Sequence, residues 1–305
     1  MTKRLAVCFS GQPRISYTAL TYFVNNVTVP FTVEGYKVDC FVHFWNTITP
    51  SGTIEKRRKK YPEYVGSPLD NPSDYKKLPA ALTYFMEQCN PVLHRFEREL
   101  TKENLVLENF CHTERNTAYN YNSQYHSVKK SHDLCRAYEI ENNFRYDYVI
   151  RARPDLSILT PLKLEECSKN YICVPNNPGH QPSMSKTELT AALQNEEYLK
   201  QLEEGADKLN VSKSEFIKRM LLDHTFDEAK ICNDQFIISS SDNMYKISRL
   251  IDYMEKEING SSSQITQEMH SPAGIGLERM LWIYIQTFSK IKKLDLKTRI
   301  EGSIP

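Results

Sequence analysis

The sequence lacks the short motifs that identify several common enzyme classes. It contains no Gly-x4-Gly-Lys-Ser/Thr phosphate loop, no Gly-x-Gly-x-x-Gly after its first apolar run, no Gly-x-Ser-x-Gly and no His-Glu-x-x-His. The first three absences disfavour P-loop kinases and sulfotransferases, Rossmann dehydrogenases and α/β-hydrolases, respectively.

Long hydrophobic runs and a charge excess are missing as well. No segment is apolar over eighteen residues, and the run 5–9 is too short for the core of a signal peptide. We therefore expect a soluble, cytoplasmic protein without a transmembrane segment. A formal net charge of +1 gives no reason to expect nucleic acid as a partner. The one dense basic run, 56–60, is either a phosphate or membrane patch or, as we favour, a solvated loop between two prolines.

The sequence also has no Cys-x-x-Cys pair among its eight cysteines. Several of them stand in apolar, strand-like runs, where a thiol behaves as a small hydrophobic side chain. In a chain of 305 residues this pattern indicates reduced, structural cysteines and argues against a structural zinc site.

What is present is an alternation of apolar, strand-like runs with helical patterns. This order predicts an α/β fold with a mostly parallel central sheet and helices on both faces. With no composition shift along the chain, we predict a single domain, 1–305, with a donor half at about 1–160 and an acceptor half at about 161–290. The expected strands are 4–10, 37–44, 105–111, 146–151, 171–174 and 235–239. The expected helices are 15–29, 78–100 broken near Pro91, 123–144, 186–222, 242–258 and 275–288, with a long surface segment at 47–79 and a peripheral tail after 290.

Three polar clusters lie beside expected strands, and ligands of open α/β sheets bind at the carboxyl ends of the strands. The first cluster follows the first strand and contains Ser10, Gly11, Gln12 and Arg14. Gly11 allows close approach of a ligand to the backbone, and Arg14 can reach a phosphate or a base edge. The alternative is an ordinary turn with a surface arginine.

The second cluster is Arg151, Arg153 and Asp155, directly after an apolar strand. Charges at the end of a buried strand are costly unless they are paired or liganded. The carboxylate can hold a divalent cation that bridges a diphosphate, and the arginines can neutralise the same phosphates. An internal ion-pair network is the alternative.

The third cluster is Asn233, Asp234 and Gln235, just before the buried strand at 236–239. Asp234 is a base that takes a proton from an acceptor hydroxyl, a group that binds this hydroxyl, or part of a strand-initiating turn.

Other candidates carry a weaker signal. Gln124, Ser127 and Lys130 share one helix face, close to a helix start expected at Ser123, where N–H groups can hold phosphate. Solvated helix surface is the alternative. In a loop before Pro272, Glu268 is a second candidate base and His270 a candidate metal ligand. Trp45 either stacks on a base or sugar or belongs to the core.

Taken in order, these patches resemble a family of predicted glycosyltransferases of large DNA viruses, algae and bacteria. The resemblance covers about 4–240 in patches, namely 6–14, 38–45, 124–130, 146–156 and 233–236, with Arg-Ala-Arg-Pro-Asp-Leu at 151–156 as the most specific. It implies a GT-A-type domain that uses a nucleotide sugar, with a UDP- or GDP-sugar favoured, and a glycan or other hydroxyl acceptor. For a viral member it implies the host cytoplasm.

The resemblance also implies Mn²⁺ or Mg²⁺ at an Asp-x-Asp motif that ends a central strand. Here Arg153-Pro154-Asp155 occupies that place, so only Asp155 matches, with His270 as its candidate co-ligand. Arg151 and Arg153 can supply the missing positive charge. Two other readings stay open, a transferase of another group on the same sheet and a non-catalytic nucleotide- or glycan-binding protein.

Overall fold

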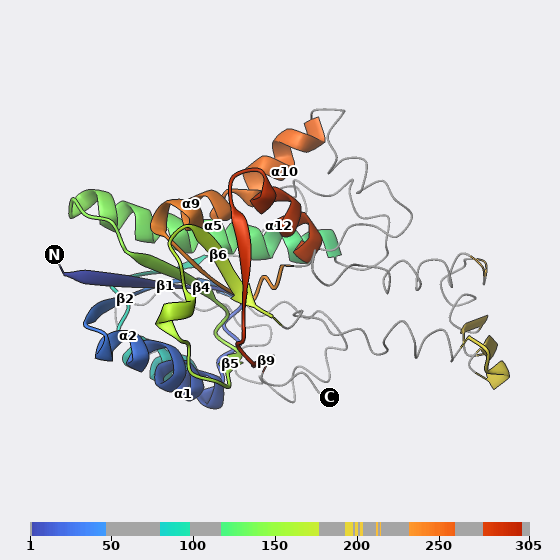
Figure 1. Ribbon diagram of the computed structural model, residues 1–305, viewed down its shortest axis with the longest axis horizontal. Helices are drawn as coiled ribbons and strands as arrows, with labels where there is room; N and C mark the ends of the chain where they lie inside the picture. The colour runs from blue at the N-terminus through green and yellow to red at the C-terminus, as the bar shows by residue number, and fades with distance from the viewer. Residues whose placement is uncertain are drawn as a thin grey trace.

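The computed structural model describes residues 2–46, 80–97, 117–176, 232–259 and 277–300, with a few positions between 193 and 214. In this part of the chain a seven-stranded sheet has the order β3-β2-β1-β4-β7-β6-β8 (Figure 1). Its strands are β1 (Lys3–Gly11), β2 (Tyr36–Trp45), β3 (Leu93–Glu97), β4 (Tyr148–Ala152), β6 (Tyr171–Pro175), β7 (Phe236–Ser239) and β8 (Lys290–Leu294). A separate pair joins β5 (Leu156–Ile158) to β9 (Thr298–Ile300).

Helices cover both faces of this sheet, because its strands are apolar on both sides. Along β1, Leu5, Val7 and Phe9 enter one core, whereas Ala6 and Cys8 enter the other. The first core lies under α1 (Tyr17–Phe23), the π-helix η1 (Val24–Thr28), α2 (Val29–Val33) and α4 (Ala80–Cys89). The second lies under α5 (Thr117–Glu141), α9 (Ser241–Ser248), α10 (Leu250–Asn259) and α12 (Leu277–Gln286) (Figure 1). A short 3-10 turn, η4, spans Leu164–Glu166.

The order of the strands creates a switch point between β1 and β4. From β1 the chain proceeds outward through the parallel strands β2 and β3. It then returns along α5, on the opposite face, to β4, which pairs in parallel with the other side of β1. The connections therefore diverge from β1 and β4, which is where open α/β sheets form their ligand crevice.

The strand β7 runs against its neighbours. It is antiparallel to β4, with Ala152 opposite Phe236, and antiparallel to β6. As a result, the residues that precede β7 lie at the same edge of the sheet as those that follow β4. The sheet is thus mostly, but not wholly, parallel, as predicted.

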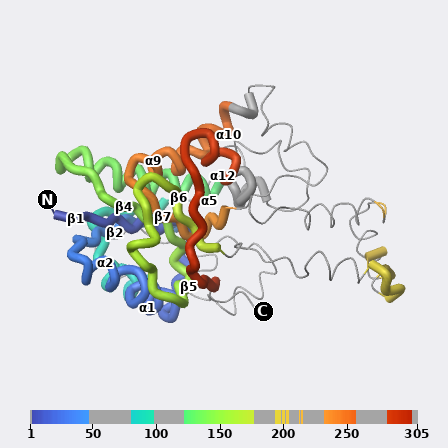
Figure 2. The backbone as a smooth tube through the Cα atoms, in the orientation of Figure 1, coloured from blue at the N-terminus to red at the C-terminus, as the bar shows by residue number. Residues whose placement is uncertain are grey.

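Several boundaries differ from the sequence-based expectation. The helix predicted for the second half of 78–100 is wrong. Asn90 takes a positive φ of 37° and ends α4, and the chain continues as β3, whose Phe96 is buried in the core. The prediction of a peripheral tail after 290 is also wrong. This segment supplies β8, which pairs with β6, and β9, which pairs with β5 (Figure 2). The helix expected from Ser123 begins at Thr117, so Ser123 is not its N-cap.

Other expectations fall partly or wholly outside the described residues. These are the surface segment 47–79, the strand 105–111 and most of the helical region 186–222. Among the cysteines that the structure describes, none forms a disulfide. No helix in the described ranges combines the length and the apolar character needed to cross a membrane.

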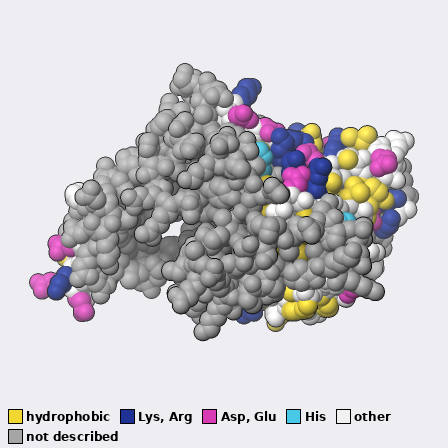
Figure 3. Space-filling view, turned by 180° about the vertical axis from the view of Figure 1, so that it is seen from behind, with side chains coloured by type: hydrophobic (Ala, Val, Ile, Leu, Met, Phe, Trp, Pro, Cys, Tyr) yellow, Lys and Arg dark blue, Asp and Glu magenta, His cyan; other side chains and the backbone are white. Residues whose placement is uncertain are grey.

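Ion pairs join the helices on the α5 face. Lys129 pairs with Asp252 of α10 at 2.5 Å, and Arg136 lies 3.6 Å from Asp242 of α9. Seen from behind, basic and acidic side chains of the described part lie next to one another (Figure 3). These pairs hold α5 against α9 and α10, and so fix the helix that borders the crevice.

Candidate functional site

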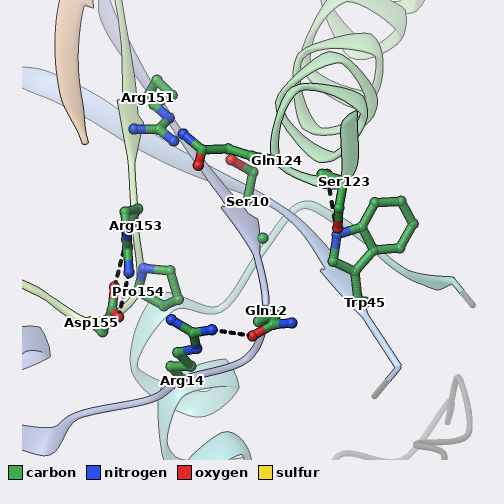
Figure 4. Close-up of a pocket in the computed structure, with 11 residues that line it drawn as sticks. Ser10, Gln12, Arg14, Trp45, Ser123, Gln124, Arg151, Arg153, Pro154 and Asp155 are labelled. Carbon is green, nitrogen blue, oxygen red and sulfur yellow. Dashed lines mark hydrogen bonds and ion pairs between the residues drawn. The ribbon is translucent and has the colours of Figure 1, made fainter. Parts of the chain in front are cut away.

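A pocket of about 210 Å³ opens at the carboxyl ends of β1 and β4, at the switch point (Figure 4). It brings together four segments that are far apart in the sequence. Eight of the predicted ligand-binding residues line it: Ser10, Gly11, Gln12, Arg14, Gln124, Arg151, Arg153 and Asp155. Trp45, Ser123 and Pro154 complete the described lining.

Arg151 is the most unusual of these side chains. It is 2% exposed, on the α5 face of β4, and its Nη1 has no hydrogen-bond partner. Burial lowers the pKa of this guanidinium, and the nearby carboxylate of Asp234 opposes that effect. An arginine in a protein keeps its charge, so the buried group is a cation with a donor left unused. An unmade hydrogen bond of this kind costs about 1–3 kcal/mol.

Ser10 presents a second unused polar group to the same pocket. Its side chain is buried, and its Oγ has no hydrogen-bond partner. It stands at the end of β1, beside Arg151 of β4 and Gln124 of α5 (Figure 4). Because native proteins pair nearly all buried polar groups, two such groups on one pocket make it a candidate site for a polar ligand.

Arg153 and Asp155 form a bidentate pair at the pocket wall. Nε of Arg153 donates to Oδ1 of Asp155 at 2.9 Å, and Nη2 donates to Oδ2 at 2.7 Å. Burial alone would raise the pKa of the Asp155 carboxyl, but the charge and hydrogen bonds of Arg153 outweigh it and hold that pKa below its ordinary value. Both carboxylate oxygens are therefore already engaged by a cation.

Arg14 lies on the loop that leaves β1. Its Nη2 donates to Oε1 of Gln12 at 2.5 Å, and its charge helps to lower the pKa of Asp155. The loop starts at Gly11, whose φ of +116° favours glycine. The turn thus carries a third guanidinium to the wall of the pocket (Figure 4).

A buried chain of polar groups fixes the position of Gly11. The N–H of Gly11 donates to Oγ of Ser127 at 2.7 Å, and this oxygen lies 2.8 Å from Nδ1 of His43. Nε2 of His43 lies 3.4 Å from Oε2 of Glu97, and Lys130 lies 3.6 Å from the same oxygen. Lys130, predicted to bind the ligand, therefore pairs with Glu97 and is not among the residues that line the pocket.

The nearby His43 ring is the main cause that lowers the pKa of Glu97 to about 2, with burial acting against it. Burial is the main cause that lowers the pKa of His43, and Glu97 opposes it. In the sequence, this buried series of polar groups is indicated by one polar residue within an apolar strand, His43. The sequence analysis did not predict it.

Asp234, predicted as a base, lies behind the pocket. Its Oδ2 accepts a hydrogen bond from Nε2 of Gln124, and it is not among the described residues that line the cavity. Gln124 therefore stands between this carboxylate and the ligand space. The geometry favours Asp234 as the counter-charge of Arg151 and the anchor of Gln124, and its role as a base stays a prediction.

Trp45 serves the core and the pocket together. Its Nε1 donates to the carbonyl oxygen of Ser123 at 3.2 Å, and its ring packs edge-on against His43 with centroids 5.0 Å apart. The side chain is buried and contributes to the pocket lining. Both interpretations of this residue from the sequence are therefore compatible with its place.

The described residues do not fit a divalent cation. They contain no cluster of three or more His, Cys, Asp or Glu side chains suited to a metal, and the one carboxylate at the pocket is held by Arg153. Three guanidinium groups line the same space. Glu268 and His270 lie outside the described residues, so the pairing of Asp155 with His270 at a metal, and Glu268 as a base, stay predictions.

Comparisons with known proteins add no functional information. No model of a known protein family matches the chain, and no curated protein is significantly similar to it. The function must therefore be argued from the chemistry of the pocket.

Proposed function

We propose that the protein is a GT-A-like glycosyltransferase that moves a sugar from a nucleotide-sugar donor to a hydroxyl of a glycan or other acceptor. The observation that carries this proposal is the buried guanidinium of Arg151, whose Nη1 has no hydrogen-bond partner and which lines a pocket at the switch point of the sheet. Arg14 and Arg153 line the same pocket, against one carboxylate. Such a pocket suits an anion with several oxygens, and a diphosphate is that kind of anion.

The place and size of the pocket support a nucleotide diphosphate. Doubly wound sheets bind nucleotides in the crevice where the strand order reverses, and this pocket occupies that crevice. Its volume of about 210 Å³ is below the roughly 300–1,000 Å³ of sites that enclose a whole drug-sized ligand. We therefore expect it to hold the diphosphate and the adjoining part of the donor.

In the proposed reaction, the bond between the anomeric carbon and the diphosphate oxygen breaks, and its electron pair leaves with the diphosphate. The acceptor hydroxyl oxygen forms the new bond to the anomeric carbon, and its proton passes to a carboxylate base, for which Asp234 and Glu268 are the candidates. Negative charge grows on the departing oxygen. Arg151, already oriented by the rigid strand β4, stabilises that charge without reorganisation.

A non-catalytic nucleotide-binding protein is the second candidate. It is favoured by one observation, the position of Asp234 behind Gln124, which places no unpaired carboxylate of the described residues beside the ligand space. The two candidates differ in turnover and not in binding, so one experiment with two readouts separates them.

The experiment combines thermal shift with product release. UDP-, GDP-, dTDP- and CMP-sugars are added to the purified protein, with Mn²⁺ or with EDTA, and free nucleoside diphosphate (CMP for CMP-sugars) is then measured with an acceptor panel. A donor at 100 times its Kd adds about 2.7 kcal/mol of stability. We expect one nucleotide class to stabilise the protein and to be consumed.

The test variant is Arg151→Met. The matched control is Arg145→Met, which replaces an exposed arginine outside the pocket. Only the Arg151 variant should lose the shift. Binding without product release from any acceptor would favour the second candidate. The absence of a shift with every sugar nucleotide would refute both.

A further inference from the structure

The positive charge of the pocket lies on arginines, and one of them is paired with Asp155, the only carboxylate among the described residues that line the pocket. Donor diphosphates in proteins are held either by a divalent cation that carboxylates position or by guanidinium groups directly. Arg151, Arg153 and Arg14 line the space, whereas both oxygens of Asp155 accept hydrogen bonds from Arg153. The described site therefore offers three guanidinium groups to a diphosphate, and its one described carboxylate is already bound by Arg153.

We propose that this pocket binds the diphosphate of the donor directly through its arginines, and that donor binding needs no divalent cation. This inference rests on the proposed function and states how that site recognises its substrate. In this proposal Asp155 is a positioning residue that orients Arg153, and it is not a metal ligand.

Arg151 and Ser10 form the deep end of this binding site. Both are buried, both line the pocket, and each has a polar atom without a partner, Nη1 and Oγ, respectively. Asp234, which accepts a hydrogen bond from Gln124, stabilises the charge of Arg151. One phosphoryl group that lies against Arg151 and Ser10 would satisfy both unpaired groups at once.

Arg14 and Arg153 form the other end. Figure 4 shows the Arg153–Asp155 pair and the Arg14–Gln12 pair below Arg151, around the same space. Their partners hold both guanidinium groups in place, so little side-chain freedom is lost when a second phosphoryl group binds. A cation entering here would have to displace Arg153 from Asp155 and would face three like charges.

The test measures the affinity of inorganic pyrophosphate and of UDP and GDP by calorimetry, with the full-length protein. Each titration is run in EDTA and in Mn²⁺, and a further titration uses Mn²⁺ alone. The variants are Arg151→Met, Asp155→Asn and, as the matched control outside the pocket, Arg145→Met.

We expect at least one of these diphosphates to bind with a Kd that changes by less than about threefold between EDTA and Mn²⁺. Loss of a charged hydrogen-bonding group corresponds to about a 10- to 100-fold weaker Kd, which we expect for Arg151→Met under both conditions. Asp155→Asn should weaken binding by the same factor in EDTA and in Mn²⁺, and Arg145→Met should leave it unchanged.

Binding that appears only with Mn²⁺, and that Asp155→Asn abolishes, would overturn this inference while leaving the proposed function in place. So would saturable binding of Mn²⁺ alone that needs Asp155. Failure of every diphosphate to bind under both conditions would instead refute the proposed function, because no donor site would exist.

Discussion

Replacing Arg151 together with its counter-charge Asp234 should make the protein more stable and less able to bind its ligand. A buried guanidinium with an unmade hydrogen bond costs about 1–3 kcal/mol, and a buried ion pair replaced by neutral side chains of similar size is often more stable. Arg151→Met alone leaves Asp234 without its positive neighbour, although Gln124 still donates to it. The clean perturbation is therefore the double variant Arg151→Met with Asp234→Asn.

The size of the effect follows from the chain length. With an unfolding entropy of about 2.1 cal/mol/K per residue, 1 kcal/mol shifts the Tm of a 305-residue chain by about 1.6 °C. We expect the double variant to melt about 2–5 °C above the parent protein, and Arg151→Met alone to melt below the double variant.

The assay is calorimetry without ligand, followed by the pyrophosphate titration. Greater stability together with lost binding is the signature of a residue kept for its ligand. A fall in Tm by the equivalent of 3 kcal/mol or more in the double variant would refute the reasoning. It would show that Arg151 holds the strand end as part of an internal network, which is the alternative that the sequence left open.

Three further predictions concern other parts of the molecule. Burial lowers the pKa of His132 to about 4, so as the pH falls the unfolded chain binds a proton at this histidine before the folded protein does. The free energy of unfolding should therefore fall by about 2 kcal/mol between pH 7.5 and pH 5. In urea titrations, His132→Gln should remove this loss, and an unchanged loss would contradict the prediction. Ser127→Ala leaves the N–H of Gly11 without its partner and should weaken pyrophosphate binding about 5- to 10-fold. Ser131→Ala, which removes contacts only to Val128 and His132 of the same helix, should not weaken it, and equal effects of the two variants would contradict the positioning role of Ser127. Leu294→Ala in β8 removes a buried side chain and should lower the free energy of unfolding in urea titrations by about 2–4 kcal/mol, whereas Lys290→Ala, at an exposed position, should lower it by less than about 0.5 kcal/mol. Equal, small effects would mean that this strand does not contribute to the core.

The sequence predicted the central strands and most of the pocket lining, for a physical reason. A strand buried on both faces is mostly apolar, so the runs 5–9 in β1 and 148–150 in β4 stand out in the sequence. The polar residues directly after such a run have to lie at the sheet edge. Ser10, Gly11, Arg151 and Arg153 could therefore be assigned to one site from their place in the chain alone.

The direction of β7 could not be predicted in that way. Nothing in the run 236–239 distinguishes a parallel from an antiparallel strand, since both are buried on two faces. Asp234 was placed near the site because polar residues adjoin a strand, but its position behind Gln124 depends on the antiparallel pairing of β7 with β4. Side-chain pairing across elements is decided by tertiary packing, which local patterns do not contain.

The edge strands were missed because their patterns are weak. The residues of β8 mix three lysines with two apolar side chains and leave most positions partly exposed, which resembles a solvated segment. A proline shortly before β3 made that stretch look like a broken helix. Strands at a sheet edge take much of their stability from pairing with a neighbour, and this pairing is not visible in a local window.

The antiparallel return of β7 to β4 also has a consequence during protein synthesis. β4 ends at Ala152, but its antiparallel partner β7 begins only at Phe236. One edge of β4 therefore stays unpaired until the ribosome has synthesised the long segment between these two strands. An uncovered hydrophobic strand edge is a template for pairing with other chains. Slow translation between these two strands would therefore favour aggregation of the nascent chain, and chaperones that hold unpaired strands should improve its yield.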